Sequence, residues 1–454
     1  MAKQKPSIPK GTRDFGPKEV QNRRFIFNKL QSCFELFGFE PIETPSFENL
    51  STLTGKYGEE GDRLIFKILN SGDFAGKVED EIWEEKDSNA LSFQISEKAL
   101  RYDLTVPFAR YVVQHNHEIN FPFKRYQMQP VWRADRPQKG RFREFTQCDA
   151  DIVGSDGLWN EVELVRLYDQ AFDSLGFESV TIKMNNRKIL SGLVQALGIQ
   201  EYWLDFTVAL DKLDKFGLEK VGQEMLERGI PSQAVDALKP LLSDDLNIDD
   251  LKAIILENEA GQKGWEELEF VLEEVEQVGL SIAKLEFDMT LARGLDYYTG
   301  AIFEVKADGV EMGSIGGGGR YDDLTGIFGL NGVSGVGISF GVDRIYLVME
   351  ALGLLKASDS KGLQVLFANF GREEARQALK CIEDLRKDGV PSALYPDSAK
   401  MKKQFAYADK IQVPYIALYG SSEIQSGKVN LKNMKTGDQT EVVVSKLGAF
   451  FSES

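Results

Sequence analysis

The sequence contains few cysteines and few histidines, three and two respectively among 454 residues. Cys33, Cys148 and Cys381 lie far apart and form no C-x-x-C pair, so we expect neither a disulfide framework nor a thiolate metal site. His115 and His117 stand two residues apart, without Glu or Cys partners at metal-ligand spacing. We therefore expect no metal site built from protein side chains, and the scarcity of cysteine fits a reducing cytoplasm.

Long hydrophobic runs are absent as well. No stretch of 18 or more apolar residues occurs, so the sequence predicts no contact with a membrane. The N-terminal stretch MAKQKPSIPKGTRDF carries charge but no apolar segment, which argues against a secretory signal. With 42% hydrophobic residues the chain can build large cores, and its length suggests roughly three domains.

The common nucleotide-binding loops are also missing. No G-x-x-x-x-G-K-[ST] pattern occurs, which excludes the P-loop solution to ATP binding, and no kinase signature set is present. The stretch from Gly335 imitates a dinucleotide fingerprint, but Phe340 occupies the position of its third glycine. Gly316–Gly319 is a run of glycines without a following lysine. This run predicts either a bulge or a place where a ligand approaches the backbone closely.

One segment is basic although the net charge of the chain is −17. Between residues 124 and 143 the only acid is Asp135. The cations there are Lys124, Arg125, Arg133, Arg136, Lys139, Arg141 and Arg143. Strand patterns at 123–129 and 145–153 flank the segment, so we expect a hairpin that gathers guanidinium groups suited to phosphate oxygens. The alternative is a solvated charged surface.

The return strand of this hairpin carries a row of polar residues. Gln147, Asp149 and Asp151 alternate along it, so all three are expected on one face. A strand that served only as scaffold would place apolar residues on such a face. The pattern therefore predicts a polar, acidic surface beside a cationic loop.

Two further clusters carry charged or aromatic residues in apolar surroundings. Arg293 stands in LARGLDYYTGAIFEV, residues 291–305, and a buried arginine needs an anionic partner, either Asp296 or a ligand phosphate. Tyr297 and Tyr298 follow, as site residues or as core aromatics. Arg344 is expected one turn inside a helix that leaves a Gly-rich strand. Arg320 and Asp322 form either a structural pair or part of a site.

The hydrophobic spacing predicts alternating helices and strands. Helices are expected at 17–37, 104–114, 158–175, 342–352, 373–387 and 398–408. Further strands are expected at 39–45, 64–69, 180–184, 285–290, 301–305, 335–340, 363–368, 391–395, 414–419, 428–433 and 439–444. Residues 78–92 are acidic and are expected to form a loop or hairpin, and 187–280 reads as a helical insertion. The part beyond 361 alternates as a small α/β domain with a mixed sheet.

Several of these segments resemble a known enzyme family. Residues 125–154 resemble motif 2 of class II aminoacyl-tRNA synthetases, GVGISFGVDR resembles motif 3, and residues 39–45 resemble motif 1, the dimer-interface motif. RGLDYY and GGGRYD resemble the two peptides peculiar to histidyl-tRNA synthetases. YDLTVPFARY and QCDADI are similar to the eukaryotic-type branch of that family. The likeness runs from about residue 10 to the C-terminus.

The resemblance implies an α+β fold with an antiparallel sheet flanked by helices. The catalytic core would occupy 1–186, with motifs 1 and 2, and 281–352, with the histidine-specific peptides and motif 3. A helical insertion domain at 187–280, a linker at 353–361 and an α/β anticodon-binding domain at 362–454 would complete the chain.

The implied activity is the ATP-dependent ligation of L-histidine to tRNA(His) through a histidyl-adenylate, with release of AMP and diphosphate. Mg²⁺ would arrive with ATP rather than in a protein site, and the enzyme would be a cytoplasmic homodimer. Two rivals remain: a regulatory subunit of ATP phosphoribosyltransferase, and a sensor module that binds uncharged tRNA. The first normally lacks the C-terminal domain and loses the RGLDYY arginine, and both features are present here.

The resemblance also assigns roles to the arginines. Arg133 matches the motif 2 arginine that binds the α-phosphate and the histidine carboxylate. Arg293 matches the arginine placed at the α-phosphate, where other class II enzymes use a metal ion. These two are the expected catalytic residues. Arg133, Arg141 and Arg344 are expected to bind ATP, and Arg136 and Gln138 are expected to face the tRNA acceptor end.

Histidine itself is expected to lie in an acid-and-tyrosine pocket. Asp103, Thr105 and Gln147 match residues that hold the α-amino group, while Asp151 and Tyr298 match those that bracket the imidazole. A pocket that matches both ring nitrogens rejects apolar isosteres, so no editing domain is needed. The full set expected to contact histidine is Asp103, Leu104, Thr105, Arg133, Gln147, Asp151, Arg293, Tyr297 and Tyr298.

Overall fold

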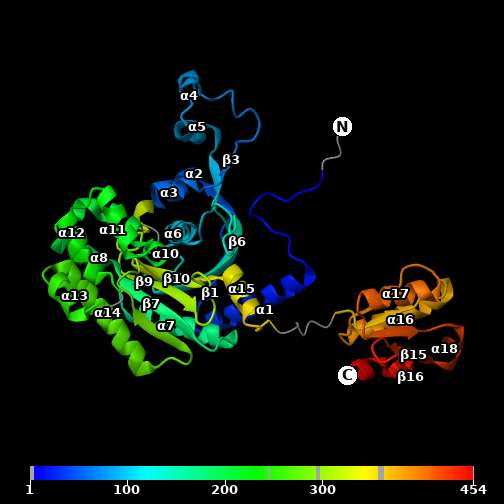
Figure 1. Cartoon of the computed structure of the whole chain (residues 1–454). Helices are drawn as coiled ribbons and strands as arrows, with labels where there is room; N and C mark the ends of the chain where they lie inside the picture. Colours follow the sequence, from blue (N-terminus) through cyan, green and yellow to red (C-terminus); the bar gives the residue numbers. More distant parts are fainter. Residues whose placement is uncertain (1–4, 244–245, 293–296, 356–361, 453–454) are drawn as a thin grey trace. The chain divides into compact units, whose positions relative to one another are not determined.

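The computed structural model describes residues 5–243, 246–292, 297–355 and 362–452. The chain divides into two compact units, Met1–Ser358 and Asp359–Ser454 (Figure 1). Each unit has its own cores, and each is described here by itself. None of the described helices combines the length and the apolar character that crossing a bilayer requires.

A large sheet organises the first unit. Its strand order among the described residues is β1-β5-β6-β11-β10-β9-β7-β8, and neighbouring strands run antiparallel except at the two edges, where β1 pairs with β5 and β7 with β8 in parallel. The strands are β1 (Glu40–Pro41), β5 (Phe123–Trp132), β6 (Glu144–Val153), β11 (Gly335–Gly341), β10 (Gly316–Tyr321), β9 (Ala301–Ala307), β7 (Val180–Asn186) and β8 (Ala283–Phe287).

Helices bury one face of this sheet. Cys148, Ala150 and Ile152 of β6 point into a core shared with helices α1, α7 and α15, so the intervening residues of β6 are left for the opposite face. Phe340 lies at the centre of this core, with ring centroids 5.6 Å from Phe34 and 4.9 Å from Tyr168. The residue that breaks the dinucleotide pattern is thus a core aromatic. The helices are α1 (Pro17–Leu36), α7 (Trp159–Ser174) and α15 (Val342–Ala351).

The described residues between 187 and 280 fold mainly into helices, as predicted, and their buried side chains continue the core of the sheet. Helices α8 and α14 cross closely, because a Cβ on Gly192 would lie 2.6 Å from the Cα of Gly261. A larger side chain at this crossing would push the two helices apart. The helices are α8 (Arg187–Ala196), α9 (Trp203–Leu210), α10 (Leu213–Phe216), α11 (Leu218–Glu227), α12 (Ser232–Leu241), α13 (Ile248–Ile255) and α14 (Glu259–Val278).

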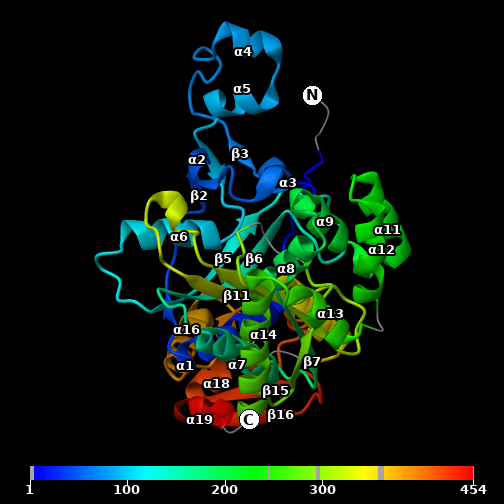
Figure 2. The same ribbon diagram turned by 90° about the vertical axis from the view of Figure 1, so that its left-hand side faces the viewer.

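A small antiparallel sheet, in the order β2-β4-β3, stands beside the large one. Two helices, α4 and α5, lie beyond it and away from the large sheet (Figures 1 and 2). They correct the expected loop or hairpin at 78–92: Asp87 accepts from the backbone N–H groups of Asn89 and Ala90 and starts α5. Neither helix buries a residue. The elements are β2 (Phe47–Asn49), α2 (Leu50–Leu53), α3 (Gly58–Arg63), β3 (Lys67–Ile68), α4 (Asp80–Glu85), α5 (Ser88–Ile95), β4 (Lys98–Leu100) and α6 (Thr105–Gln114).

The second unit is the predicted α/β domain with a mixed sheet, in the order β13-β12-β14-β15-β16. Strand β12 alternates between two cores: Val365 and Phe367 face one, Leu366 and Ala368 the other. The elements are β12 (Val365–Phe367), α16 (Arg372–Lys387), β13 (Ser392–Leu394), α17 (Met401–Lys410), β14 (Tyr415–Leu418), α18 (Ser421–Ser426), β15 (Lys428–Asn433), β16 (Gln439–Val443) and α19 (Leu447–Ser452).

Most expected elements are present, but several differ in extent. The segment expected to be extended at 39–45 pairs only at Glu40–Pro41, and that expected at 64–69 pairs only at Lys67–Ile68. The glycine run is neither a loop nor a bulge, because Gly316–Tyr321 forms the regular strand β10 between β11 and β9. The last expected helix of the second unit begins at Met401 rather than 398.

Candidate active site

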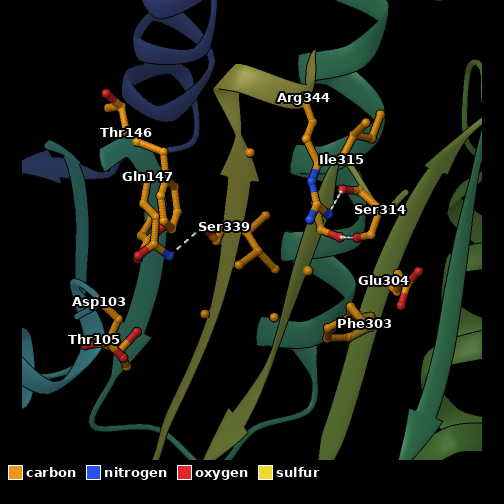
Figure 3. Close-up of a pocket in the computed structure, with 18 of the residues that line it drawn as sticks. Asp103, Thr105, Thr146, Gln147, Phe303, Glu304, Ser314, Ile315, Ser339 and Arg344 are labelled. Carbon is orange, nitrogen blue, oxygen red and sulfur yellow. Dashed lines mark hydrogen bonds between the residues drawn. The ribbon is translucent and has the colours of Figure 1, made fainter. Parts of the chain in front are cut away.

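A cavity of about 390 Å³ lies on the face of the large sheet opposite the helices. This volume falls in the usual range for small-molecule sites. Its floor comes from strands β6, β11, β10 and β9, and its rim from the loop between β5 and β6 and from the start of α15. Figure 3 shows Asp103 and Thr105 on one side, Phe303 and Glu304 on the other, and Arg344 reaching down from the helix end.

Buried carboxylates form one end of the cavity. Asp103, Asp149 and Asp151 each expose 3% or less of their surface, and all three line the cavity. Asp103 accepts hydrogen bonds from the Tyr57 hydroxyl at 2.8 Å and from the Tyr297 hydroxyl at 3.2 Å. Burial raises the pKa of Asp103, while the hydrogen bond from Tyr57 acts in the opposite direction. These side chains give the end of the cavity an acidic character.

Asp151 has partners on both of its oxygens. Its Oδ1 accepts from the Tyr321 hydroxyl at 2.5 Å, and its Oδ2 lies 2.8 Å from Nη2 of the fully buried Arg125. Burial raises the pKa of Asp151, and the Arg125 guanidinium opposes this effect. Among the described residues, Asp151 is the carboxylate within ion-pair distance of Arg125. One cation therefore faces several acids, so this end favours a cationic ligand.

Tyrosines line the acidic end as hydrogen-bond donors. The hydroxyls of Tyr297 and Tyr321 donate to Asp103 and Asp151 respectively. Burial raises the pKa of Tyr297, Tyr298 and Tyr321 well above the usual value, and the neighbouring charges of the aspartates raise it further. All three hydroxyls therefore keep their protons at neutral pH, and Tyr298 also lines the cavity.

Arginines form the other end of the cavity. Arg133 follows β5 directly, donates from Nε to the carbonyl of Tyr102 at 3.1 Å, and lies over the Tyr102 ring. The side chain of Arg141 is 48% exposed, and its Nη1 atom lies 3.9 Å from Oδ1 of Asp135. Arg344 donates to the carbonyls of Gly140 at 3.0 Å and Ser314 at 2.7 Å. These three guanidinium groups line the same cavity as the acids.

Backbone contacts hold the basic loop against α15. Gln138 and Arg141 exchange backbone hydrogen bonds of 3.1 and 2.9 Å, and Gly140 between them takes a positive φ of 74°. The carbonyl of Gly140 then accepts from Arg344. Arg141 and Arg344, two of the three arginines expected to bind ATP, are thus positioned by one short turn.

The N-terminal segment supports the same loop from outside. The Arg13 guanidinium lies 3.3 Å from the ring centroid of Phe142 and donates to Asp343 at 2.5 Å. Asp343 also accepts from Arg23 and from the backbone N–H of Thr146. Phe142 follows Arg141 in sequence and Asp343 precedes Arg344, so this network fixes the backbone at both cationic positions.

Glycines form part of the cavity floor and place no side chains there. A Cβ on Gly337 of β11 would lie 1.9 Å from Oδ1 of Asp151, which is closer than any side chain can approach. Gly316, Gly317 and Gly318 of β10 also line the cavity. The glycine run therefore leaves this part of the cavity floor without side chains, and the close approach of a ligand there stays a prediction.

The structure brings most of the predicted site residues together. The predicted residues that line the cavity are Asp103, Thr105, Arg133, Arg141, Gln147, Asp151, Tyr297, Tyr298 and Arg344. Leu104 is buried at the start of α6 and is not among the lining residues. Arg136 and Gln138 are exposed on the loop, outside the lining. Arg293 and its possible partner Asp296 lie outside the described residues.

Other predicted groups have structural roles. Arg320 is buried and donates from Nε and Nη2 to both oxygens of Glu161, at 2.5 and 2.7 Å, with Asp322 at 3.5 Å. Its main partner is therefore Glu161, which the sequence patterns did not indicate. His115 contacts Glu118 at the end of α6, outside the cavity.

Some site residues carry no sequence signal. Tyr57 lies in a segment without recognisable periodicity, yet its hydroxyl fixes Asp103. Ser339 accepts a hydrogen bond from Gln147 Nε2 at 3.2 Å across two paired strands (Figure 3). The alternation along β6 predicts that Asp149 shares a face with Gln147 and Asp151, but it indicates no function for this side chain. Only the pairing of β6 with β11 and the packing of Tyr57, at the start of α3, against Asp103, just before α6, reveal these contacts.

Comparisons with known proteins agree with this site. A family model described as histidyl-tRNA synthetase matches residues 11–75 and 94–345, and one described as an anticodon binding domain matches 364–454. The histidine–tRNA ligase of Christiangramia forsetii is 62% identical over 97% of this chain and 97% of its own length. That of Flavobacterium johnsoniae is 58% identical over 96% of this chain and 97% of its own length.

A solved structure gives the same result. The crystal structure of histidyl-tRNA synthetase from Nostoc sp. PCC 7120 is similar with a TM-score of 0.78 and 29% identity, covering 99% of this chain and 100% of that one. The sheet, its cavity and the attached α/β unit define a class II aminoacyl-tRNA synthetase. Within that class, the chain belongs to the histidyl-tRNA synthetase family. The predicted fold class and family are confirmed, and both relatives named above are bacterial although the motifs resemble the eukaryotic-type branch.

Proposed function

We propose that the chain activates L-histidine with ATP and transfers it to tRNA(His). The observation that carries this proposal is the polarity of the cavity, which has buried carboxylates at one end and arginines at the other. Histidine presents an ammonium group and an imidazole, whereas ATP presents phosphates. A cavity with these two ends binds both substrates with the carboxylate of histidine next to the α-phosphate.

In the first step a histidine carboxylate oxygen attacks the α-phosphorus, and the bond to diphosphate breaks. Arg133 and Arg293 stabilise the negative charge that grows on the phosphoryl oxygens. Arg141 and Arg344 hold the ATP. Asp103, Thr105 and Gln147 bind the α-ammonium group, with Leu104 contributing from its backbone position at the start of α6. The carboxylate is itself the nucleophile, so this step needs alignment and charge but no protein base.

The imidazole lies between Asp151 and Tyr298, with Tyr297 beside them. Because the tyrosine hydroxyls stay protonated, they can serve a ring nitrogen that lacks a hydrogen, while a carboxylate accepts from the N–H. An apolar isostere would leave these buried groups unpaired, which supports strong selection without editing.

In the second step a terminal ribose hydroxyl of tRNA attacks the carbonyl carbon of the adenylate, and AMP leaves. A phosphate oxygen of the adenylate accepts the proton. Arg136 and Gln138, exposed on the loop, face the acceptor end. The unit matched by the anticodon-binding model, residues 364–454, contacts the anticodon.

Mg²⁺ accompanies ATP in this proposal. Within the described ranges, no group of three or more His, Cys, Asp or Glu side chains is arranged to hold a metal ion. The oxygens of the triphosphate suit this hard cation, and it would neutralise charge on the β- and γ-phosphates. We further propose a homodimer formed through the motif 1 segment. A cytoplasmic location fits the three cysteines, which are all free thiols.

Histidine-dependent ATP–pyrophosphate exchange tests the proposal. The purified protein should show exchange with L-histidine and only background exchange with other amino acids. A flat trace with folded protein would instead favour a binding module, either the regulatory subunit or the tRNA sensor. Aminoacylation of tRNA(His) would then establish the second step.

A further inference from the structure

The N-terminal segment, residues 9–15, contacts the basic loop between β5 and β6. All of its residues are described by the structure, and none of them lines the cavity. The backbone N–H of Arg143 donates to the carbonyl of Gly11 at 2.8 Å, and the basic loop is also bonded to Arg344 of α15. The proposed function gives this segment no task.

Arg13 of this segment connects the two elements that carry cations at the arginine end of the cavity. Its guanidinium lies 3.3 Å from the ring centroid of Phe142, which follows Arg141 and lines the cavity. The same group donates from Nη2 to Oδ1 of Asp343 at 2.5 Å, and Asp343 precedes Arg344. One side chain from outside the cavity therefore contacts the sequence neighbours of both cations.

Asp343 is the carboxylate on which this connection depends. Its side chain is 6% exposed and lines the cavity, and its Oδ2 accepts from the backbone N–H of Thr146 at 3.3 Å. Arg23 of α1 donates to Oδ1 together with Arg13. An uncompensated carboxylate in the lining would repel phosphates, so the two guanidinium groups also remove an unfavourable charge from the cavity.

Gly11 allows the N-terminal segment to approach the loop this closely. Its φ of 87° is a left-handed conformation that residues with a side chain rarely adopt. A Cβ at this position would lie 2.8 Å from Cγ of Arg143 and 2.8 Å from Cγ of Pro137. A substitution at Gly11 should therefore displace the segment without removing a charge.

We propose that Arg13 is a positioning residue for ATP, which keeps the basic loop and the start of α15 in the arrangement that binds the nucleotide. Because Arg13 is not among the lining residues, it acts through Phe142 on Arg141 and through Asp343 on Arg344. This inference rests on the proposed function and adds to it that the N-terminal segment completes the ATP subsite.

Direct ATP binding and exchange kinetics test this inference. Arg13→Ala should raise both the KM for ATP and the dissociation constant for ATP, measured by calorimetry on the ligand-free protein, roughly tenfold, because displaced cations bind the phosphates less well. The KM for L-histidine should stay within about twofold, since tyrosines and Arg125 hold the carboxylates of the acidic end. Arg13→Lys keeps the charge beside Asp343 but not the planar group on Phe142, so it should restore part of the affinity for ATP.

Gly11→Ala displaces the segment by a different route, because Arg13 is still present. It should also weaken ATP binding, and the double variant with Arg13→Ala should bind ATP little worse than either single variant, since both changes displace the same segment. Lys10→Ala serves as the control: Lys10 is an exposed cation of the same segment, so its removal should leave ATP binding unchanged. Melting temperatures show whether each variant is folded.

Three results would overturn the inference. The first is an unchanged dissociation constant for ATP in Arg13→Ala. The second is an equal rise in the KM values for ATP and L-histidine, which would indicate general damage to the cavity. The third is an equal loss of ATP binding in Lys10→Ala, which would show that only the total charge matters. Absence of exchange in the wild type would instead count against the proposed function, so the two failures can be told apart.

Discussion

Asp103, Asp149 and Asp151 show how position alone differentiates three side chains of one type. All three are buried in one cavity, but tyrosines hydrogen-bond to two of them and a guanidinium faces one. Burial raises the pKa of each. At the arginine end, by contrast, the side chains are partly exposed and face the part of the cavity to which the proposed function assigns the phosphates. Single substitutions at the two ends should therefore have different consequences.

The first prediction concerns Arg133. Replacement by Ala removes a fixed cation from the α-phosphate, so histidine-dependent exchange should fall about 10²- to 10³-fold in kcat, by analogy with lost oxyanion donors. The same loss is predicted for Arg293→Ala. Arg136→Ala is the matched control: its side chain is exposed outside the cavity, so exchange should persist. Full exchange activity in Arg133→Ala would remove the catalytic assignment.

The second prediction concerns stability and pH. The pKa of Asp149 is about 7 in the folded protein, because burial disfavours its charge, whereas an unfolded aspartate titrates near pH 4. Between these two pH values the folded state holds a proton that the unfolded state has released. The contribution of protonated Asp149 to the free energy of unfolding is therefore full below about pH 4 and is lost as the pH rises to about 7. Asp149→Asn lacks this titration.

Melting temperatures of the ligand-free wild type and of Asp149→Asn, measured at several pH values, test the direction of this pH dependence. Between pH 5 and pH 8 the wild type should lose stability relative to Asp149→Asn. The difference in unfolding free energy is on the order of a few kcal/mol over the full window. A constant difference across this range would show that Asp149 does not titrate there.

At the scale of elements, strand β6 explains why much of the site could be predicted. Its alternation separates the buried Cys148, Ala150 and Ile152 from the polar row, and this pattern is visible in the sequence. The pattern does not show which residues of other elements contact these polar side chains. Tyr57, Tyr321 and Arg125 reach the acids from other elements, so their contacts depend on register and packing rather than on local spacing.

The helices α4 and α5, unlike strand β6, could not be predicted from the sequence pattern. Their sequence is acidic and lacks a buried stripe, so hydrophobic periodicity gave no reason to expect helices there. The local cap at Asp87 determines the second helix instead. The sequence did not predict strand β10 either, because glycine has a low strand preference. Pairing on both sides with β9 and β11 overrides this preference.

The third prediction tests the contact between β11 and β6. Gly337→Ala places a Cβ 1.9 Å from Oδ1 of Asp151, so the carboxylate or the strand must move. We expect a loss of about 1–3 kcal/mol in unfolding free energy and at least a tenfold rise in the KM for histidine. Gly222→Ala is a suitable control, because its Cβ would meet Val235 at an ordinary 3.6 Å. A normal KM in Gly337→Ala would show that Asp151 tolerates displacement.

At the scale of the whole molecule, the two units have separate hydrophobic cores. The residues that line the cavity all belong to the first unit. The cavity to which we assign activation therefore lies in the first unit, while the second unit carries the match to the anticodon-binding model.

The fourth prediction follows from this division. Deletion of residues 362–454 should leave the KM for ATP in the exchange assay nearly unchanged and raise the KM for tRNA in aminoacylation at least tenfold, because contacts to the anticodon are lost. The isolated fragment 362–454 should unfold cooperatively by circular dichroism, since its sheet is covered by a core on each face. Equal losses of both activities on truncation would contradict the division of labour.

The helices α4 and α5 also bear on how this protein can be handled. Residues 76–93 fall between the two segments matched by the family model, and neither helix contributes a buried side chain. A spectroscopic label or an affinity tag grafted at this tip would report on the enzyme without disturbing its interior.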